Sequence, residues 1–210
     1  MKIFLEDVFF QLLSRWNCTG ATANKYWGKI KSSYSDKNRH YHTLPHLESV
    51  IYHLYSVKDE INDMDTVLFS AFYHDVVYSN IWKDNEEKSA LLAQSTLRDI
   101  NYPEELIELC TEQILATKTH TISQSNDANI FVDADLAILG TNWEEYYNYT
   151  INIRKEYSIY PDLIYKPGRI KVLKSFLEQP NIFKTLHFQN IFEKNARENI
   201  EKEIELNSKR

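Results

Sequence analysis

Glycine and proline are scarce in this chain, and their scarcity restricts its fold more than any other feature. The 210 residues include 4 Gly and 5 Pro, too few for the tight turns that join many short strands. Apolar residues instead recur at helical spacing, beginning with Phe4, Val8, Leu12 and Trp16. We therefore predict an all-α protein.

The composition predicts one folded domain that spans residues 1–210. The hydrophobic fraction of 43% is typical of a globular chain, and no repeat or low-complexity tract divides it.

The formal net charge of −6 provides no basic field for a nucleic-acid polymer or an anionic membrane. No apolar run reaches the roughly 20 residues of a membrane-spanning helix. Cys18 and Cys110 lack the spacing of a disulfide framework, so we expect a cytoplasmic protein. The oligomeric state is left open.

Periodicity and punctuation place the helices. We expect them over about 4–16, 21–30, 45–54, 67–78, 84–100, 103–117, 130–139, 143–157, 170–177 and 192–206. Thr43 and Asp84 are predicted N-caps, and the polar stretch 119–129 is predicted to be a loop. The range 67–78 is almost continuously apolar, so its helix should be buried on most sides.

His74 and Asp75 interrupt this apolar helix. An ionised carboxylate in such a place must be paired or bind a cation. Adjacent helical residues point about 100° apart, so both side chains can converge on one ion in a groove between helices. His46 and Asp135 are candidates for the remaining ligands. The alternatives are a buried structural pair at 74–75, and Asp133 in place of Asp135 or as a ligand of a second ion or phosphate. Asp133 could also cap its helix.

Further polar residues are candidates for roles around this metal. His42 and His120 could bind a second metal or a phosphate, with Lys118 as a nearby cation, or could be exposed to solvent. Glu86 shares a helical face with apolar residues and is a candidate general base or outer ligand. Glu87 remains an alternative because helix boundaries are uncertain by a residue or two. Both glutamates could instead be acids favoured by the helix dipole.

Two arginines in the aromatic second half are candidates for binding a substrate phosphate. The planar guanidinium groups of Arg154 and Arg169 can form bidentate hydrogen bonds with phosphate oxygens, and Tyr157 is a weaker neighbouring candidate. The alternative is that both arginines lie on solvated helix faces. The 14 Tyr and 10 Phe are typical of core packing.

The order His46, His74-Asp75, Asp135 resembles the HD superfamily of metal-dependent phosphohydrolases. The resemblance covers about ninety residues and is closer to one uncharacterised bacterial branch of that superfamily. The segments that carry it are Arg39-His40-Tyr41-His42-Thr43-Leu44-Pro45-His46, His74-Asp75-Val76-Val77-Tyr78, Asp84-Asn85-Glu86-Glu87-Lys88-Ser89-Ala90 and Asp133-Ala134-Asp135-Leu136-Ala137-Ile138-Leu139-Gly140.

The resemblance implies an HD-type helical bundle with a metal site built from about residues 42–135. It implies a mononuclear or dinuclear centre that hydrolyses phosphomonoesters or phosphodiesters, often of nucleotides. We expect a divalent ion, Mn, Fe, Co, Mg or Zn, that activates water for attack on the phosphate of a small substrate, and Asp75 or Glu86 could orient or deprotonate that water. No Gly-Tyr-Pro motif follows the His-Asp pair, which disfavours cyclic-dinucleotide cleavage. Two rival hypotheses are a di-iron oxygenase on the same ligands, and a metal-stabilised binding or regulatory module without turnover.

Overall fold

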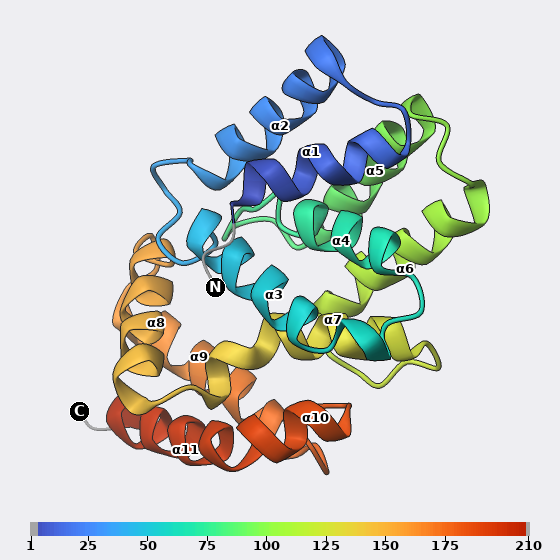
Figure 1. Ribbon diagram of the computed structural model, residues 1–210. Coiled ribbons are helices and arrows are strands. Elements are labelled where there is room, and N and C mark those ends of the chain that lie inside the picture. Colours follow the sequence, from blue (N-terminus) through green and yellow to red (C-terminus); the bar gives the residue numbers. More distant parts are fainter. Residues whose placement is uncertain (1–3, 209–210) are drawn as a thin grey trace.

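The computed structural model describes residues 4–208, and within this range all regular secondary structure is helical, without a strand (Figure 1). The all-α prediction is therefore confirmed. The elements are α1 (Leu5–Arg15), α2 (Gly20–Tyr34), α3 (Leu44–Ser56), η1 (Lys58–Glu60), α4 (Met64–Tyr73), α5 (Asn85–Asp99), α6 (Glu104–Thr119), α7 (Asn126–Leu136), η2 (Ala137–Gly140), α8 (Trp143–Glu156), α9 (Asp162–Leu177), α10 (Leu186–Phe188), η3 (Gln189–Glu193) and α11 (Lys194–Ser208).

Helices α3, α4 and α7 form the middle of the molecule. Helix α4 contacts α1, α3, α5, α6 and α7, and its residues from Thr66 to Tyr73 are all buried. Figure 1 shows α8 to α11 gathered at the opposite end from α1 and α2, with α11 packed against α9 and η2. No helix between residues 4 and 208 is long and apolar enough to cross a bilayer.

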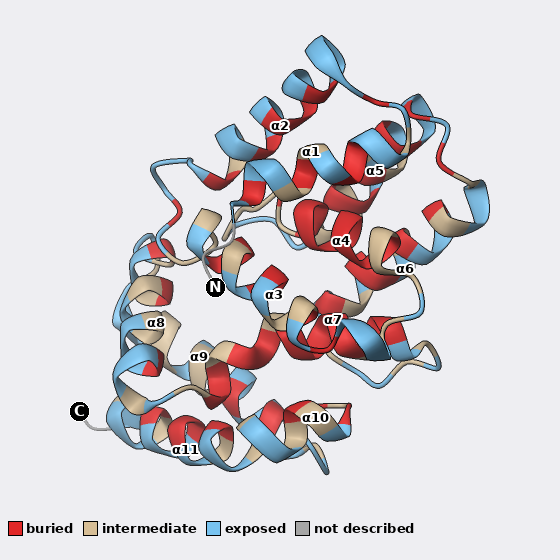
Figure 2. Cartoon of the chain, viewed as in Figure 1, coloured by how far each residue is buried: buried red, intermediate tan, exposed pale blue. Residues whose placement is uncertain are grey.

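The core follows from which helix faces are apolar. Figure 2 shows α4 and α7 almost entirely buried, whereas α2, α5 and α11 keep an exposed outer face. Aromatic rings fill the space between α1 and α4, where Phe9 and Phe72 lie with centroids 4.8 Å apart. The His74 ring lies 5.5 Å from that of Phe131 in α7. The core therefore extends to the end of α4, where the polar pair begins.

The predicted helix over 67–78 is wrong in its last turn. Helix α4 ends at Tyr73, His74 is its C-cap, and Asp75 lies in the turn that follows. The buried guanidinium of Arg39 donates from Nη1 to the Asp75 carbonyl at 2.6 Å and from Nη2 to the Val76 carbonyl at 3.0 Å. These carbonyls gain a charged donor in place of the amides of a continuing helix.

Several predicted helix ends also differ in detail. Thr43 does occupy an extended N-cap position, but its hydroxyl donates to the Tyr41 carbonyl instead of capping α3. Asp84 precedes α5 without a capping hydrogen bond from its side chain. The loop predicted over 119–129 is shorter, because Ser125 caps α7 and the helix begins at the next residue. Periodicity located these helices, but it does not specify which polar group closes each end.

A close helix contact at Gly140 leads to the first prediction. A Cβ atom there would lie within 3.0 Å of the Cα, Cβ and carbonyl oxygen of Phe192. We expect Gly140→Ala to lower the free energy of unfolding by about 1–3 kcal/mol, because backbone must move to relieve the overlap. The matched control is Gly28→Ala in α2, where a Cβ meets no atom within 4 Å, and which should stabilise by about 0.5–1 kcal/mol. Equal changes in the two denaturation curves would contradict this packing.

Candidate metal centre

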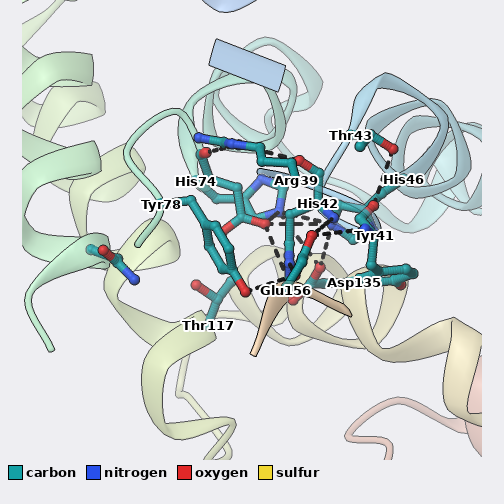
Figure 3. Close-up of polar contacts among 12 residues, drawn as sticks. Arg39, Tyr41, His42, Thr43, His46, His74, Tyr78, Thr117, Asp135 and Glu156 are labelled. Carbon is teal, nitrogen blue, oxygen red and sulfur yellow. Dashed lines mark hydrogen bonds and ion pairs between the residues drawn. The ribbon is translucent and has the colours of Figure 1, made fainter. Parts of the chain in front are cut away.

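Four side chains from three central helices converge at the end of α4. His46 lies in the first turn of α3, His74 is the C-cap of α4, Asp75 lies in the turn that follows α4, and Asp135 lies in the last turn of α7. The two histidine Nε2 atoms are 3.3 Å apart. Asp135 Oδ1 lies 3.2 Å from His46 Nε2 and 3.6 Å from His74 Nε2. Asp75 Oδ2 lies 3.3 Å from His74 Nε2 and 3.7 Å from His46 Nε2. Figure 3 shows His46, His74 and Asp135 in this arrangement.

The orientation of His74 leaves its metal-binding nitrogen available. His74 Nδ1 lies 2.7 Å from the Ala71 carbonyl oxygen, which can only accept, so Nδ1 carries a proton and donates it. Nε2 then directs its lone pair toward the cluster in the neutral imidazole. A metal-binding histidine usually makes this kind of second contact, because it orients the ring and selects the tautomer. His46 and His74 are only 6% and 1% exposed, so bulk water does not compete at their nitrogens.

The spacing of these four atoms fits a shared cation. Ligands held at about 2.0–2.2 Å from one ion are separated from each other by roughly 2.8–3.6 Å in tetrahedral or octahedral geometry. The observed separations of 3.2–3.7 Å are close to this range, whereas charged N–H···O hydrogen bonds are nearer to about 2.7–2.9 Å. His46, His74 and Asp75 form a buried group that could hold a metal ion. Asp135 Oδ1 supplies a fourth candidate ligand atom, 3.2 and 3.6 Å from the two imidazole Nε2 atoms.

The electrostatics of the cluster favour added positive charge. Burial raises the pKa of Asp75, but His74, His42 and His46 together lower it more strongly, so the pKa lies below its usual value. The Asp135 pKa is likewise lowered, against its own burial, by His46 and His74. Burial lowers the His74 pKa, and Tyr34 and Asp75 raise it more strongly. Two ionised carboxylates therefore require compensation, either by protons on the imidazoles or by a divalent cation.

Glu156, at the end of α8, organises the loop that precedes α3 and was missed by sequence reasoning. Its Oε1 accepts the backbone N–H groups of His40, Tyr41 and His42 at 2.7–3.0 Å. Its Oε2 lies 2.7 Å from His42 Nδ1 and accepts the Tyr78 hydroxyl at 2.8 Å (Figure 3). Burial raises the Glu156 pKa, but the hydrogen bonds from His42 and the loop amides lower it to about 2.

A cavity of about 600 Å³ opens beside the cluster. Asp75 and Asp135 reach its wall together with His42 and His74. The His42 ring stacks on the Tyr78 ring with centroids 4.2 Å apart (Figure 3), and His42 Nε2 lies 4.0 Å from Oδ2 of the candidate ligand Asp75. The candidate ligands are therefore accessible from this cavity, although the imidazoles are buried.

Several other predicted residues also line this cavity. They are Glu86, Lys118, His120, Tyr157 and Arg169. Lys118 forms an ion pair with Glu87, and its Nζ lies 4.0 Å from Glu86 Oε2. Neither His42 nor His120 is exposed, so the solvent-exposed alternative is wrong for both. Burial lowers the His120 pKa and raises the Glu86 pKa. Glu87 is not among the lining residues, because its carboxylate is directed to Lys118.

Two predicted ligands have structural roles instead. Asp133 accepts the backbone N–H of Lys184 at 2.7 Å, and the backbone N–H and hydroxyl of Thr185 at 2.7 and 2.8 Å. Its carboxylate thus holds the segment before α10 and is turned away from a second metal or phosphate. Arg154 pairs with Asp162 and donates to the carbonyls of the turn between α8 and α9. It does not line the cavity and is not a phosphate clamp there.

Comparison of the chain with models of known protein families, with curated proteins and with solved structures found no match. The structure therefore supports an all-helical protein with a buried His/His/Asp group that could hold a metal ion. The resemblance to the HD superfamily is carried by the motifs and their order in the sequence, and no family match adds to it.

The two aspartates of α7 give the second prediction. We expect Asp135→Ala to lose bound metal while keeping the fold, because its oxygen contacts both imidazoles. Asp133→Ala should keep the metal but unfold about 2–4 kcal/mol more easily, since three donors at Lys184 and Thr185 lose their acceptor. Elemental analysis and thermal denaturation of both variants measure these effects. Metal loss in Asp133→Ala with retention in Asp135→Ala would reverse the assignment.

Proposed function

We propose that this protein is a metal-dependent phosphohydrolase of the HD type that hydrolyses a phosphate ester of a small molecule. The observation that carries the proposal is the joint position of His46, His74, Asp75 and Asp135, with nitrogen and oxygen atoms 3.2–3.7 Å apart beside a cavity. Mixed imidazole and carboxylate ligands suit Mn, Fe, Co or Zn, and Mg remains a further candidate. Substrate and water would reach an ion held by these residues from the cavity, because His74, Asp75 and Asp135 lie on its wall.

A divalent ion in this centre would act as a Lewis acid, polarising a phosphoryl oxygen and making water nucleophilic at neutral pH. The chain's own residues then handle protons and charge. Glu86 lies on the cavity wall and its pKa is raised by burial, which suits a carboxylate that accepts the proton of the attacking water. Lys118 and the neutral imidazole of His120 face the same cavity and can donate hydrogen bonds to phosphoryl oxygens.

The experiment that tests this proposal is phosphate release from a panel of phosphorylated metabolites and nucleotides, measured on protein loaded separately with each metal. Release that depends on metal and disappears in Asp75→Ala would support the proposal. Oxygen consumption without phosphate release, together with an iron-dependent optical band, would favour the di-iron oxygenase. Binding of a substrate analogue without any product would favour a binding or regulatory module.

The third prediction separates Glu86 from its neighbour. We expect Glu86→Gln to retain metal but lower kcat by roughly 10²-fold or more, because the amide keeps the shape and cannot accept the proton. Glu87→Gln is the matched control. It removes the same charge one residue along, from a carboxylate that pairs with Lys118 outside the cavity lining, and should retain most of the turnover. A large loss in Glu87→Gln alone would transfer the proton-accepting role to Glu87.

A further inference from the structure

Several tyrosine rings line the cavity beside the candidate centre, and we call them the tyrosine wall: Tyr41, Tyr149, Tyr157 and Tyr165. The Tyr41 ring lies 4.9 Å from the His46 ring and 4.6 Å from the Tyr149 ring, measured between centroids. The Tyr149 hydroxyl accepts a hydrogen bond from Arg169 Nη2 at 3.2 Å. A planar or ring-containing group bound beside the centre would therefore lie against aromatic surface.

The guanidinium beside this wall is already neutralised. Arg169 donates from Nε to Glu203 Oε1 at 2.8 Å and from Nη2 to Glu203 Oε2 at 3.1 Å. The Tyr146 hydroxyl also donates to Glu203. The two charged side chains are only 10% and 5% exposed, so solvent screens their attraction little. Arg169 consequently contributes fixed hydrogen-bond donors to the cavity rather than a free positive charge.

One nitrogen of Arg169 remains available to a ligand. Within residues 4–208 no protein acceptor bonds to Nη1, whereas Nε and Nη2 both have partners. Nη1 is not fully enclosed by protein, so it retains accessible surface. Because Arg169 lines the cavity, a bound molecule can reach these two N–H donors.

Among the described lining residues, the Lys and Arg side chains are Lys118 and Arg169, and each has a carboxylate partner. Lys118 is assigned above to the phosphate at the centre, which leaves Arg169 as the cation for a second phosphate, and Arg169 is paired with Glu203. Asp75, Asp135 and Glu86 add negative charge, of which a divalent ion would balance two units. A ligand with several phosphates would therefore meet uncompensated repulsion.

We propose that the substrate is a phosphomonoester with a single phosphate on an uncharged ring, such as a sugar or a nucleoside. The ring lies along the tyrosine wall, and a neutral acceptor on it receives a hydrogen bond from Arg169 Nη1. Arg169, held by Glu203, is then a specificity-determining residue. This inference rests on the proposed phosphohydrolase activity, because that activity puts the phosphate at the metal centre.

Matched ligand pairs test the inference on the wild-type protein. The pairs are a hexose monophosphate with the corresponding bisphosphate, and a nucleoside 5′-monophosphate with the corresponding triphosphate. Glycerol phosphate serves as the ligand without a ring. We expect kcat/KM and calorimetric affinity to favour each monophosphate by about tenfold or more, and a ring-containing monophosphate over glycerol phosphate. Comparison of the two pairs distinguishes sugar from nucleoside. Equal or better use of the bisphosphate and triphosphate, or of glycerol phosphate, would overturn the inference.

A charge-selective variant gives the fourth prediction. Glu203→Gln leaves Arg169 uncompensated, so the bisphosphate-to-monophosphate ratio of kcat/KM should rise by about tenfold. Glu104→Gln is the control, because it removes the same charge from an exposed ion pair with Arg98 that is not part of the cavity lining, and it should leave the ratio unchanged.

If Glu203→Gln does not fold, the double variant Arg169→Gln/Glu203→Gln removes the pair together. It should raise KM for ring-containing monophosphates without favouring bisphosphates. An unchanged ratio and an unchanged KM would overturn the role of Arg169.

Binding separates this inference from the proposed reaction. If no compound releases phosphate, the proposed function fails, and calorimetry with the same pairs on metal-loaded protein then decides the ligand class. Tighter binding of the ring-containing monophosphates would uphold it. Absence of binding by all of them, or tighter binding of the bisphosphate or triphosphate, would overturn it.

Discussion

The contact between Arg39 and the end of α4 determines the geometry of the candidate centre. Its guanidinium binds the carbonyls of Asp75 and Val76, so the chain can leave the helix while its polar backbone groups stay paired. If the helix continued, the Asp75 side chain would point about 100° away from that of His74 around the helix axis. The turn instead directs its carboxylate toward His74 and His46.

The loop that carries Arg39 depends in turn on a buried anion. The Glu156 carboxylate accepts hydrogen bonds from three consecutive backbone amides, from the His42 ring and from the Tyr78 hydroxyl. Its side chain is almost fully enclosed, and such a charge is tolerated only when several donors satisfy it. A single residue of α8 thereby orders the chain before α3, and through that chain the position of Arg39. The C-terminal helices thus contribute to a site whose candidate ligands come from α3, α4 and α7.

Local sequence signals predicted part of this arrangement. Periodicity placed most helices, and the interruption of an apolar run identified His74 and Asp75. The same signals failed where a distant partner decides the outcome. The range 74–78 has apolar residues typical of helix, but the chain leaves the helix there, and distant side chains bind the freed backbone: Arg39 at the Asp75 and Val76 carbonyls, and Ser89 at the N–H and carbonyl of Val77. Glu156 and Glu203 look like ordinary helix acids, because their partners at His42 and Arg169 become neighbours only in the fold. Asp133 and Asp135 are two residues apart in α7, so their side chains leave the helix in nearly opposite directions. Asp133 therefore meets the segment before α10, and Asp135 meets the two imidazoles.

The two ends of the cavity use charge in opposite ways. At the centre, Asp75 and Asp135 outnumber nearby fixed cations, so the site has capacity for an added ion. Around Arg169, Glu203 cancels the guanidinium charge, and tyrosine rings and aliphatic side chains line the cavity. A free guanidinium there would attract any anion and compete with the centre for phosphate. Because the pair is neutral, electrostatic attraction is confined to the metal end, and contacts with rings and neutral acceptors act at the other. This separation would orient a ligand with one charged group in a single direction, with the phosphate at the candidate ligands.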